Sequence, residues 1–280
     1  MGAAEPSLVR VTVSADPGLD EALQAEAAVR WPAGVELVAP GVVAAYEAAD
    51  VDASAIARSV SSALGAPVEA AVEAVPPGWA DAWRAFHRPV RVGRLVVRPP
   101  WEPRTGAPAL DLVIEPAQAF GTGAHATTRA CLELLLDEPP GPWLDLGCGS
   151  GVLALAAALA GHAPVTGVDA EEAAVAAARE NAARNGLGRR VRFDRWTLLP
   201  GGGLPAAERI VANLQLEPLL VLAEALRRPG AARPRTLVLS GLLMGQDGTV
   251  VAALAGYRLR RRRPLDGWVA LALDRIEDRG

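Results

Sequence analysis

The stretch from Trp143 to Gly151 constrains the fold of this chain more than any other. It reads Trp-Leu-Asp-Leu-Gly-Cys-Gly-Ser-Gly and is followed at once by a segment rich in Ala and Leu. The pattern predicts a buried strand, a tight glycine turn and a helix that begins at Val152. Because glycines carry no Cβ, a ligand can approach the backbone of this turn, and the free N–H groups of the helix lie beside it.

The spacing of the glycines indicates the kind of ligand. A dinucleotide fingerprint requires Gly-x-Gly-x-x-Gly, whereas the glycines here alternate at Gly147, Gly149 and Gly151. Asp145 disfavours a nearby pyrophosphate but can accept from an ammonium group. A second expected strand ends at Asp169, where a carboxylate can accept hydrogen bonds from ribose hydroxyls. This combination resembles the first two motifs of S-adenosylmethionine-dependent methyltransferases; a glycine turn without a ligand is the alternative.

Strands and helices alternate after the glycine turn. This order predicts an α/β fold with a mostly parallel, Rossmann-like sheet that helices cover on both faces. Ligands of such sheets bind beyond the carboxyl ends of the strands, and the fourth expected strand ends at Asn213. An amide there offers an acceptor to an amine, although capping of the next helix is an alternative role.

The N-terminal part predicts a separate domain. Residues 1–75 have the order strand, helix, strand, strand, helix, strand, which is the split ferredoxin-like pattern of a small α+β domain. We expect this domain to recognise the substrate, with a purely stabilising role as the alternative. The run Pro-Pro-Gly marks a boundary, so residues 76–89 are expected to form a linker helix and residues 90–280 the catalytic domain.

The segment from Phe120 to Thr128 reads Phe-Gly-Thr-Gly-Ala-His-Ala-Thr-Thr. Its glycines predict a flexible loop, and its paired threonines are expected to open a helix over Arg129 to Leu136. Threonines at a helix start normally cap it, but this loop lies just before the cofactor strand and can fold over a ligand. His125 has no evident carboxylate partner in the sequence, so we interpret it as a loop-ordering or substrate-side residue rather than a base.

Composition excludes several classes of protein. The net charge of −4 argues against a mainly electrostatic nucleic-acid binder. The two cysteines, Cys131 and Cys148, make no zinc pattern with the three histidines, so no metal is expected and a reducing, cytoplasmic setting fits. No signal peptide or apolar run long enough for a membrane span is evident. The basic cluster at Arg260 to Arg263 is interpreted as a solvated edge strand, with RNA contact as the alternative.

These motifs together resemble the ribosomal protein L-eleven methyltransferase family. The resemblance rests on the segment Phe120 to Thr128, the run Asp145 to Gly151, the end of the second strand at Gly167-Val-Asp169, the pair Ala212-Asn213 and the run Leu239-Ser-Gly-Leu-Leu243. It implies transfer of methyl groups from S-adenosylmethionine to lysine side chains and the N-terminal amine of one large-subunit ribosomal protein. It also implies cofactor contacts at Thr122, Thr128, Gly147, Gly149, Asp169 and Asn213, with Asn213 at the reacting centre.

The expected reaction is a direct displacement in which a neutral amine attacks the methyl group. A lysine amine has a pKa of about 10.4 and must lose its proton first, but desolvation and the nearby sulfonium both lower that pKa. Positioning then suffices without an obligatory carboxylate base. We expect a monomer with no nucleic-acid requirement. The alternatives are a methyltransferase of the same fold acting on RNA or a small molecule, a nicotinamide oxidoreductase, and a non-catalytic ribosome-assembly module.

Overall fold

The computed structural model describes residues 8–31, 35–48, 51–75, 87–106, 108–116, 123–228, 230 and 233–276. The chain divides into two compact units, Met1–Phe86 and His87–Gly280. The expected linker helix at residues 76–89 falls mainly on residues outside the described ranges. It therefore stays a prediction, as do the expected domain limits on either side of it.

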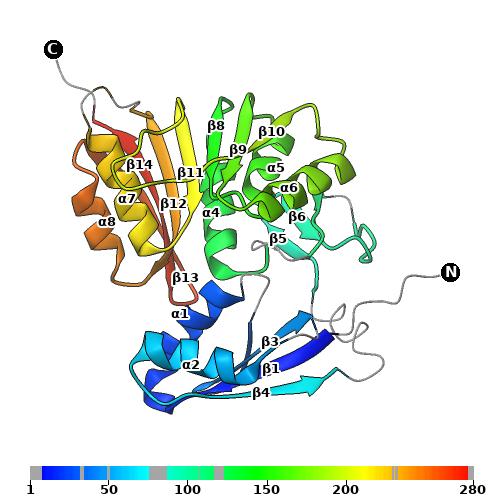
Figure 1. Cartoon of the computed structure of the whole chain (residues 1–280). Coiled ribbons are helices and arrows are strands. Elements are labelled where there is room, and N and C mark those ends of the chain that lie inside the picture. The colour runs from blue at the N-terminus through cyan, green and yellow to red at the C-terminus, as the bar shows by residue number, and fades with distance from the viewer. Residues whose placement is uncertain are drawn as a thin grey trace. The chain divides into compact units, whose positions relative to one another are not determined.

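The first unit has the split ferredoxin-like order that the sequence predicts. Its elements are β1 (Leu8–Ser14), η1 (Pro17–Leu19), α1 (Asp20–Arg30), β2 (Glu36–Ala39), β3 (Val42–Ala48), α2 (Ala53–Leu64) and β4 (Glu69–Ala74). The described strands form an antiparallel sheet in the order β2-β3-β1-β4 (Figure 1). Val9, Val11 and Val13 alternate along β1 and are buried, because one face of this sheet packs on the two helices.

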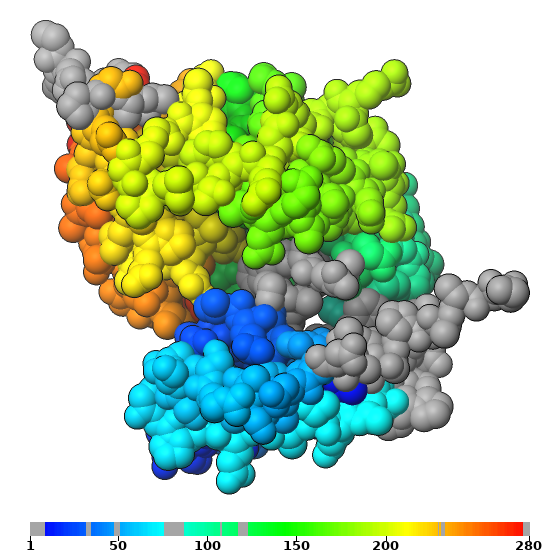
Figure 2. Space-filling model, in the orientation of Figure 1, coloured from blue at the N-terminus to red at the C-terminus, as the bar shows by residue number. Residues whose placement is uncertain are grey.

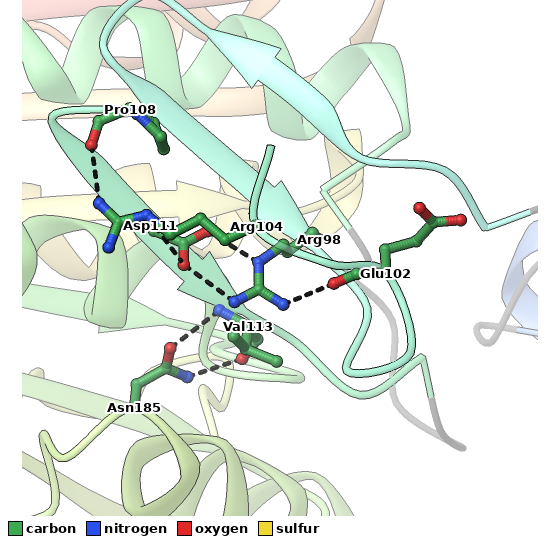
Figure 3. Close-up of polar contacts among 7 residues, drawn as sticks. All are labelled: Arg98, Glu102, Arg104, Pro108, Asp111, Val113 and Asn185. Carbon is green, nitrogen blue, oxygen red and sulfur yellow. Dashed lines mark hydrogen bonds and ion pairs between the residues drawn. The ribbon is translucent and has the colours of Figure 1, made fainter. Parts of the chain in front are cut away.

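The second unit begins with a small sheet, made by β5 (Val90–Val92), β6 (Leu95–Arg98) and β7 (Leu110–Val113) in that order. Arg98 and Asp111 join its two parallel strands. Arg98 donates from Nε to Oδ1 and from Nη2 to Oδ2 of Asp111, each at 2.9 Å (Figure 3). Arg98 also donates from Nη1 to the carbonyl of Glu102 at 2.7 Å. A two-bond contact of this kind fixes orientation as well as distance, so β6 and β7 are held in register.

The remaining elements build the large sheet of the second unit. They are α4 (Ala126–Leu136), β8 (Trp143–Leu146), α5 (Val152–Leu159), β9 (Val165–Asp169), α6 (Glu172–Arg184), β10 (Val191–Arg195), β11 (Arg209–Asn213), α7 (Leu216–Arg227), β12 (Thr236–Leu243), α8 (Asp247–Ala253), β13 (Tyr257–Leu265) and β14 (Trp268–Arg275). Within the described ranges, seven strands pair in the order β10-β9-β8-β11-β12-β14-β13 (Figure 1). The first five are parallel, and β14 is antiparallel to both of its neighbours.

This topology confirms the predicted mostly parallel α/β sheet. The chain starts the sheet at β8, adds β9 and β10 on one side, and then returns to add β11 and β12 on the other. The order therefore reverses between β8 and β11. In open sheets of this type, a ligand binds outside the carboxyl ends of the strands at this reversal.

Helices cover both faces of the large sheet, as predicted. The helices α4, α5 and α6 pack into one hydrophobic cluster, and α7 and α8 pack into the other. In β8, Trp143 belongs to the first cluster whereas Leu144 and Leu146 belong to the second, because successive side chains of a strand point to opposite faces. Burial on both faces explains why the whole of β8 is buried.

Residues 196–207 lead from β10 to β11 along the surface. Leu198 and Leu204 pack against the hydrophobic cluster on the α7 side, and Arg228 donates a hydrogen bond to the carbonyl of Gly201. Figure 2 shows this segment in yellow-green beside the yellow α7. The segment is therefore held on the α7 side of the sheet by packing, and at the end of α7 by a hydrogen bond from a side chain to its backbone.

Candidate active site

The glycine turn follows β8 directly. Gly147, Gly149 and Gly151 have φ angles of 76°, 52° and 81°, a region that side chains with a Cβ rarely adopt. The N–H of Gly147 donates to the carbonyl of Val168 at 2.9 Å, which ties the turn to β9. A Cβ on Gly147 would lie 2.5 Å from Leu214 Cδ2. The backbone conformation therefore favours glycine here, and a Cβ would also require the flexible Leu214 side chain to shift.

Asp145 lies beneath this turn and is wholly buried. Its Oδ2 accepts a hydrogen bond from Ala154 N at 3.0 Å, while its Oδ1 has no partner among the described residues. Burial raises its pKa to about 7; the Ala154 N–H opposes this shift and the charge of Asp169 adds to it. The carboxyl group therefore lies in the interior, where it accepts a hydrogen bond from the first turn of α5.

Asp169 ends β9 and links the second strand to the glycine turn. Its Oδ2 accepts from Gly149 N at 2.9 Å, and its Oδ1 accepts from Glu171 N at 3.1 Å. The side chain stays half-buried. The sequence predicted the turn and this acid as two separate motifs, and the structure joins them by a direct hydrogen bond.

Asn213 ends β11, the strand that pairs with β8. Its Nδ2 donates to the hydroxyls of Thr127 at 3.2 Å and Thr128 at 3.3 Å. No described residue donates a hydrogen bond to its Oδ1. Helix α7 begins at Leu216 with Gln215 as its N-cap, so Asn213 does not cap it. The amide is instead held by two hydroxyls with its carbonyl oxygen available as an acceptor.

The start of α4 differs from the prediction. The helix begins at Ala126 rather than Arg129, and its N-cap is His125, whose Nδ1 accepts from Thr127 N at 3.3 Å. Thr127 and Thr128 therefore lie in the first turn, not at the cap, and both are buried. This placement directs both hydroxyls towards the Asn213 amide.

Three further side chains complete this cluster and were not predicted as a group. The hydroxyl of Thr127 lies 2.8 Å from His125 Nδ1, and Ser240 Oγ donates to the Thr127 carbonyl at 2.9 Å. The His125 ring packs edge-on against Trp268, with centroids 5.0 Å apart. Burial lowers the pKa of His125, which favours the neutral ring that can accept at Nδ1. Local sequence offers no signal for these contacts, since Ser240 and Trp268 lie on β12 and β14.

Most predicted site residues therefore meet at one edge of the large sheet. Gly147, Gly149, Asp169 and Asn213 are half-buried at the ends of β8, β9 and β11, and Thr128 contacts Asn213 from α4. Thr122 lies outside the described residues and stays a prediction.

Comparison with known proteins identifies the family. The sequence model described as "Ribosomal protein L11 methyltransferase (PrmA)" matches residues 20–275. The chain belongs to the ribosomal protein L11 methyltransferase family. The resemblance read from the motifs is thereby confirmed.

Individual relatives of the same family agree with this assignment. The chain is 42% identical over 202 residues to a ribosomal protein L11 methyltransferase of Pelotomaculum thermopropionicum, which covers 69% of this chain and 64% of the relative. It is 38% identical over 239 residues to that of Syntrophotalea carbinolica, covering 78% and 76%. The crystal structure of a ribosomal protein L11 methylase from Lactobacillus delbrueckii subsp. bulgaricus superposes with a TM-score of 0.59 at 26% identity, over 69% of this chain and all of that one.

The basic cluster Arg260 to Arg263 lies on β13, an edge strand, as predicted. Each of its four guanidinium groups is paired with an acid. The partners are Glu138 and Asp274 for Arg260, Asp137 for Arg261, Asp247 for Arg262 and Glu133 for Arg263. Paired charges leave little positive potential for a phosphate backbone, so these contacts do not favour the RNA alternative.

Three further observations concern metal binding, the cysteines and membrane spans. In the part of the chain that the structure describes, no group of three His, Cys, Asp or Glu side chains is placed to hold a metal ion. Cys131 and Cys148 are buried, and burial raises the pKa of both thiols. Among the same residues, no helix combines the length and the apolar character that crossing a membrane requires.

Proposed function

We propose that this family member transfers methyl groups from S-adenosylmethionine to lysine side chains and the N-terminal amine of ribosomal protein L11. The observation that carries the proposal is the Asn213 amide. It is fixed by Thr127 and Thr128 next to the glycine turn, and none of the residues that the structure describes donates to its carbonyl oxygen. The protein substrate is inferred from the relatives, which are named ribosomal protein L11 methyltransferases.

The residues present fit S-adenosylmethionine. Asp169 lies half-buried beside the turn, and Asp145 lies buried beneath it with an acceptor, Oδ1, that has no partner among the described residues. The Asp169 carboxylate suits a ligand with hydroxyl donors and a cationic sulfur, and it disfavours the pyrophosphate of a nicotinamide cofactor. The residues that would hold the cofactor are Thr122, Thr128, Gly147, Gly149, Asp169 and Asn213. When bound, the cofactor supplies an activated methyl group.

The chain's own residues bind and orient the amine. Asn213 Oδ1 accepts a hydrogen bond from the substrate nitrogen, which leaves the nitrogen lone pair free to point elsewhere. The side chains that hold Asn213 are neutral hydroxyls. A neutral acceptor binds an amine without stabilising its protonated form as strongly as a carboxylate would. Positioning of a neutral amine is thus the contribution expected from this cluster.

We further propose that the enzyme works as a monomer in the cytoplasm, where a ribosomal protein substrate is made and assembled. Light scattering of the purified chain with and without L11 tests the first part. A single-chain mass for the free enzyme supports it, and a stable dimer contradicts it.

The activity is tested by incubating the enzyme with purified L11 and methyl-labelled S-adenosylmethionine. The chain contains no lysine, so label on lysine after digestion must belong to the substrate. We expect label on lysines and on the N-terminal amine of L11, and loss of at least about two orders of magnitude in kcat/KM for N213A. Absence of transfer by the wild-type enzyme, or label on added RNA instead, contradicts the proposal.

A further inference from the structure

Asn181 on α6 connects two segments that are far apart in the sequence. The residue is 1% exposed. Its Nδ2 donates to the carbonyl of Ser150 in the glycine turn, and its Oδ1 accepts from Glu115 N, each at 3.0 Å. Glu115 directly follows Ile114 at the end of β7. One buried amide therefore joins the glycine turn to the end of β7.

Asn185 lies one helical turn further on and extends this contact. Its Oδ1 accepts from Val113 N at 2.8 Å, and its Nδ2 donates to Val113 O at 2.6 Å (Figure 3). Asn181 and Asn185 thus pair with alternate residues of the β7 segment, as a neighbouring strand would. The geometry matches, because four residues of a helix rise about 6 Å and two residues of a strand about 6.6 Å.

The two asparagines differ in what else they touch. Among the described residues, the other acceptor of Asn185 Nδ2 is the Asn181 carbonyl of α6, at 2.7 Å. Asn181 reaches out of the helix to Ser150, the residue between Gly149 and Gly151. Both residues support β7, but only Asn181 carries that support to the glycine turn.

We propose that Asn181 is a positioning residue of the cofactor site: it sets the position of Ser150, which lies between Gly149 and Gly151, against Glu115 just after β7. The proposal rests on the function proposed above. Without the amide, Ser150 O and Glu115 N lose this shared partner and the two segments can move apart. Leaving a buried polar group without its partner also lowers the stability of the folded protein. A loss of stability therefore cannot show that Asn181 positions the cofactor site, and Asn185 serves as the matched control.

The test compares N181D with N185D. Each substitution keeps the size of the side chain and the acceptor for β7, and each replaces an NH2 donor with an oxygen. We expect the larger loss of stability in urea for N181D, because Asn181 is 1% exposed and Asn185 is half-buried. The decisive comparison is S-adenosylmethionine binding by the folded variants, measured by calorimetry. N181D should raise Kd at least about tenfold, whereas N185D should change it less than about twofold. With N181D, KM for the cofactor should rise while kcat at saturating cofactor and KM for L11 stay close to wild type.

N181A keeps the inference testable if N181D does not fold, because it removes both bonds without placing a carboxylate against a carbonyl. Equal Kd values for the Asn181 and Asn185 variants, whether both unchanged or both raised, overturn the role of Asn181. A wild-type protein that binds no S-adenosylmethionine overturns the proposed function instead. The two failures are therefore distinguishable.

Discussion

Replacing Asp145 with Asn should change how the stability of this protein depends on pH. The Asp145 carboxyl is wholly buried, with one oxygen on Ala154 N and the other without a described partner. Burial raises its pKa from 3.8 to about 7, although the Ala154 N–H opposes the shift. An amide has the same shape and keeps the acceptor for Ala154 but does not titrate. The difference between the two proteins therefore isolates the buried charge.

The magnitude follows from proton linkage. Between 3.8 and about 7 the folded state of the wild type holds a proton that the unfolded state has lost, so the free energy of unfolding falls as the pH rises. The contribution of protonated Asp145 to the free energy of unfolding is complete below pH 3.8 and is lost above about pH 7. At about 1.4 kcal/mol for each pH unit, the whole contribution is about 4 kcal/mol. From about pH 5 to about pH 8, the wild type should lose about 3 kcal/mol relative to D145N.

Urea denaturation of both proteins without cofactor, followed by tryptophan fluorescence at several pH values, measures this difference. Other titrating groups are present in both proteins, so their contributions cancel to first order. The result that refutes the reasoning is a pair of parallel curves. Parallel curves would mean that Asp145 ionises in the folded protein as easily as in the unfolded chain.

Two other substitutions test the structural account. G241A should lower the free energy of unfolding in urea by about 2–4 kcal/mol, because it combines a φ of 90° with a Cβ placed 2.3 Å from the backbone oxygen of Leu214, whereas G186A, at a φ of 68° with nothing within 4 Å, should lower it by only about 1 kcal/mol; equal losses contradict the close approach of the Leu214 backbone to Gly241. R98K should lower the free energy of unfolding by about 1–2 kcal/mol, because a lysine cannot make the two-bond contact that Arg98, only 15% exposed, makes with Asp111. The control R192K, at a residue 77% exposed, should change it by less than about 0.5 kcal/mol. A larger loss for R192K than for R98K contradicts this role of Arg98.

Much of the fold could be predicted from the sequence because its signals are local. The glycine turn, the alternating strands and helices, and the polar residues that end strands at Asp169 and Asn213 are visible in short windows. Parallel pairing then brings those strand ends to one edge. The insertion of β14 between β12 and β13 could not be predicted in this way, because it depends on pairing between distant segments.

The site details that were missed depend on long-range packing. Asn181 and Asn185 look like ordinary polar residues of a helix, and their partners lie 66 and 72 residues away. The first turn of α4 was misassigned because threonine favours a cap in isolation, whereas here Thr127 and Thr128 are buried against Asn213. Likewise, the pairing of the arginines on β13 depends on acids that come mostly from other elements.

The most direct test of the central claim is a crystal structure of this enzyme with S-adenosylmethionine. We expect density along the backbone of Gly147 and Gly149, with the ribose beside Asp169 and the methyl group facing Asn213. Density at another place, or no density at a concentration that saturates methyl transfer, contradicts it.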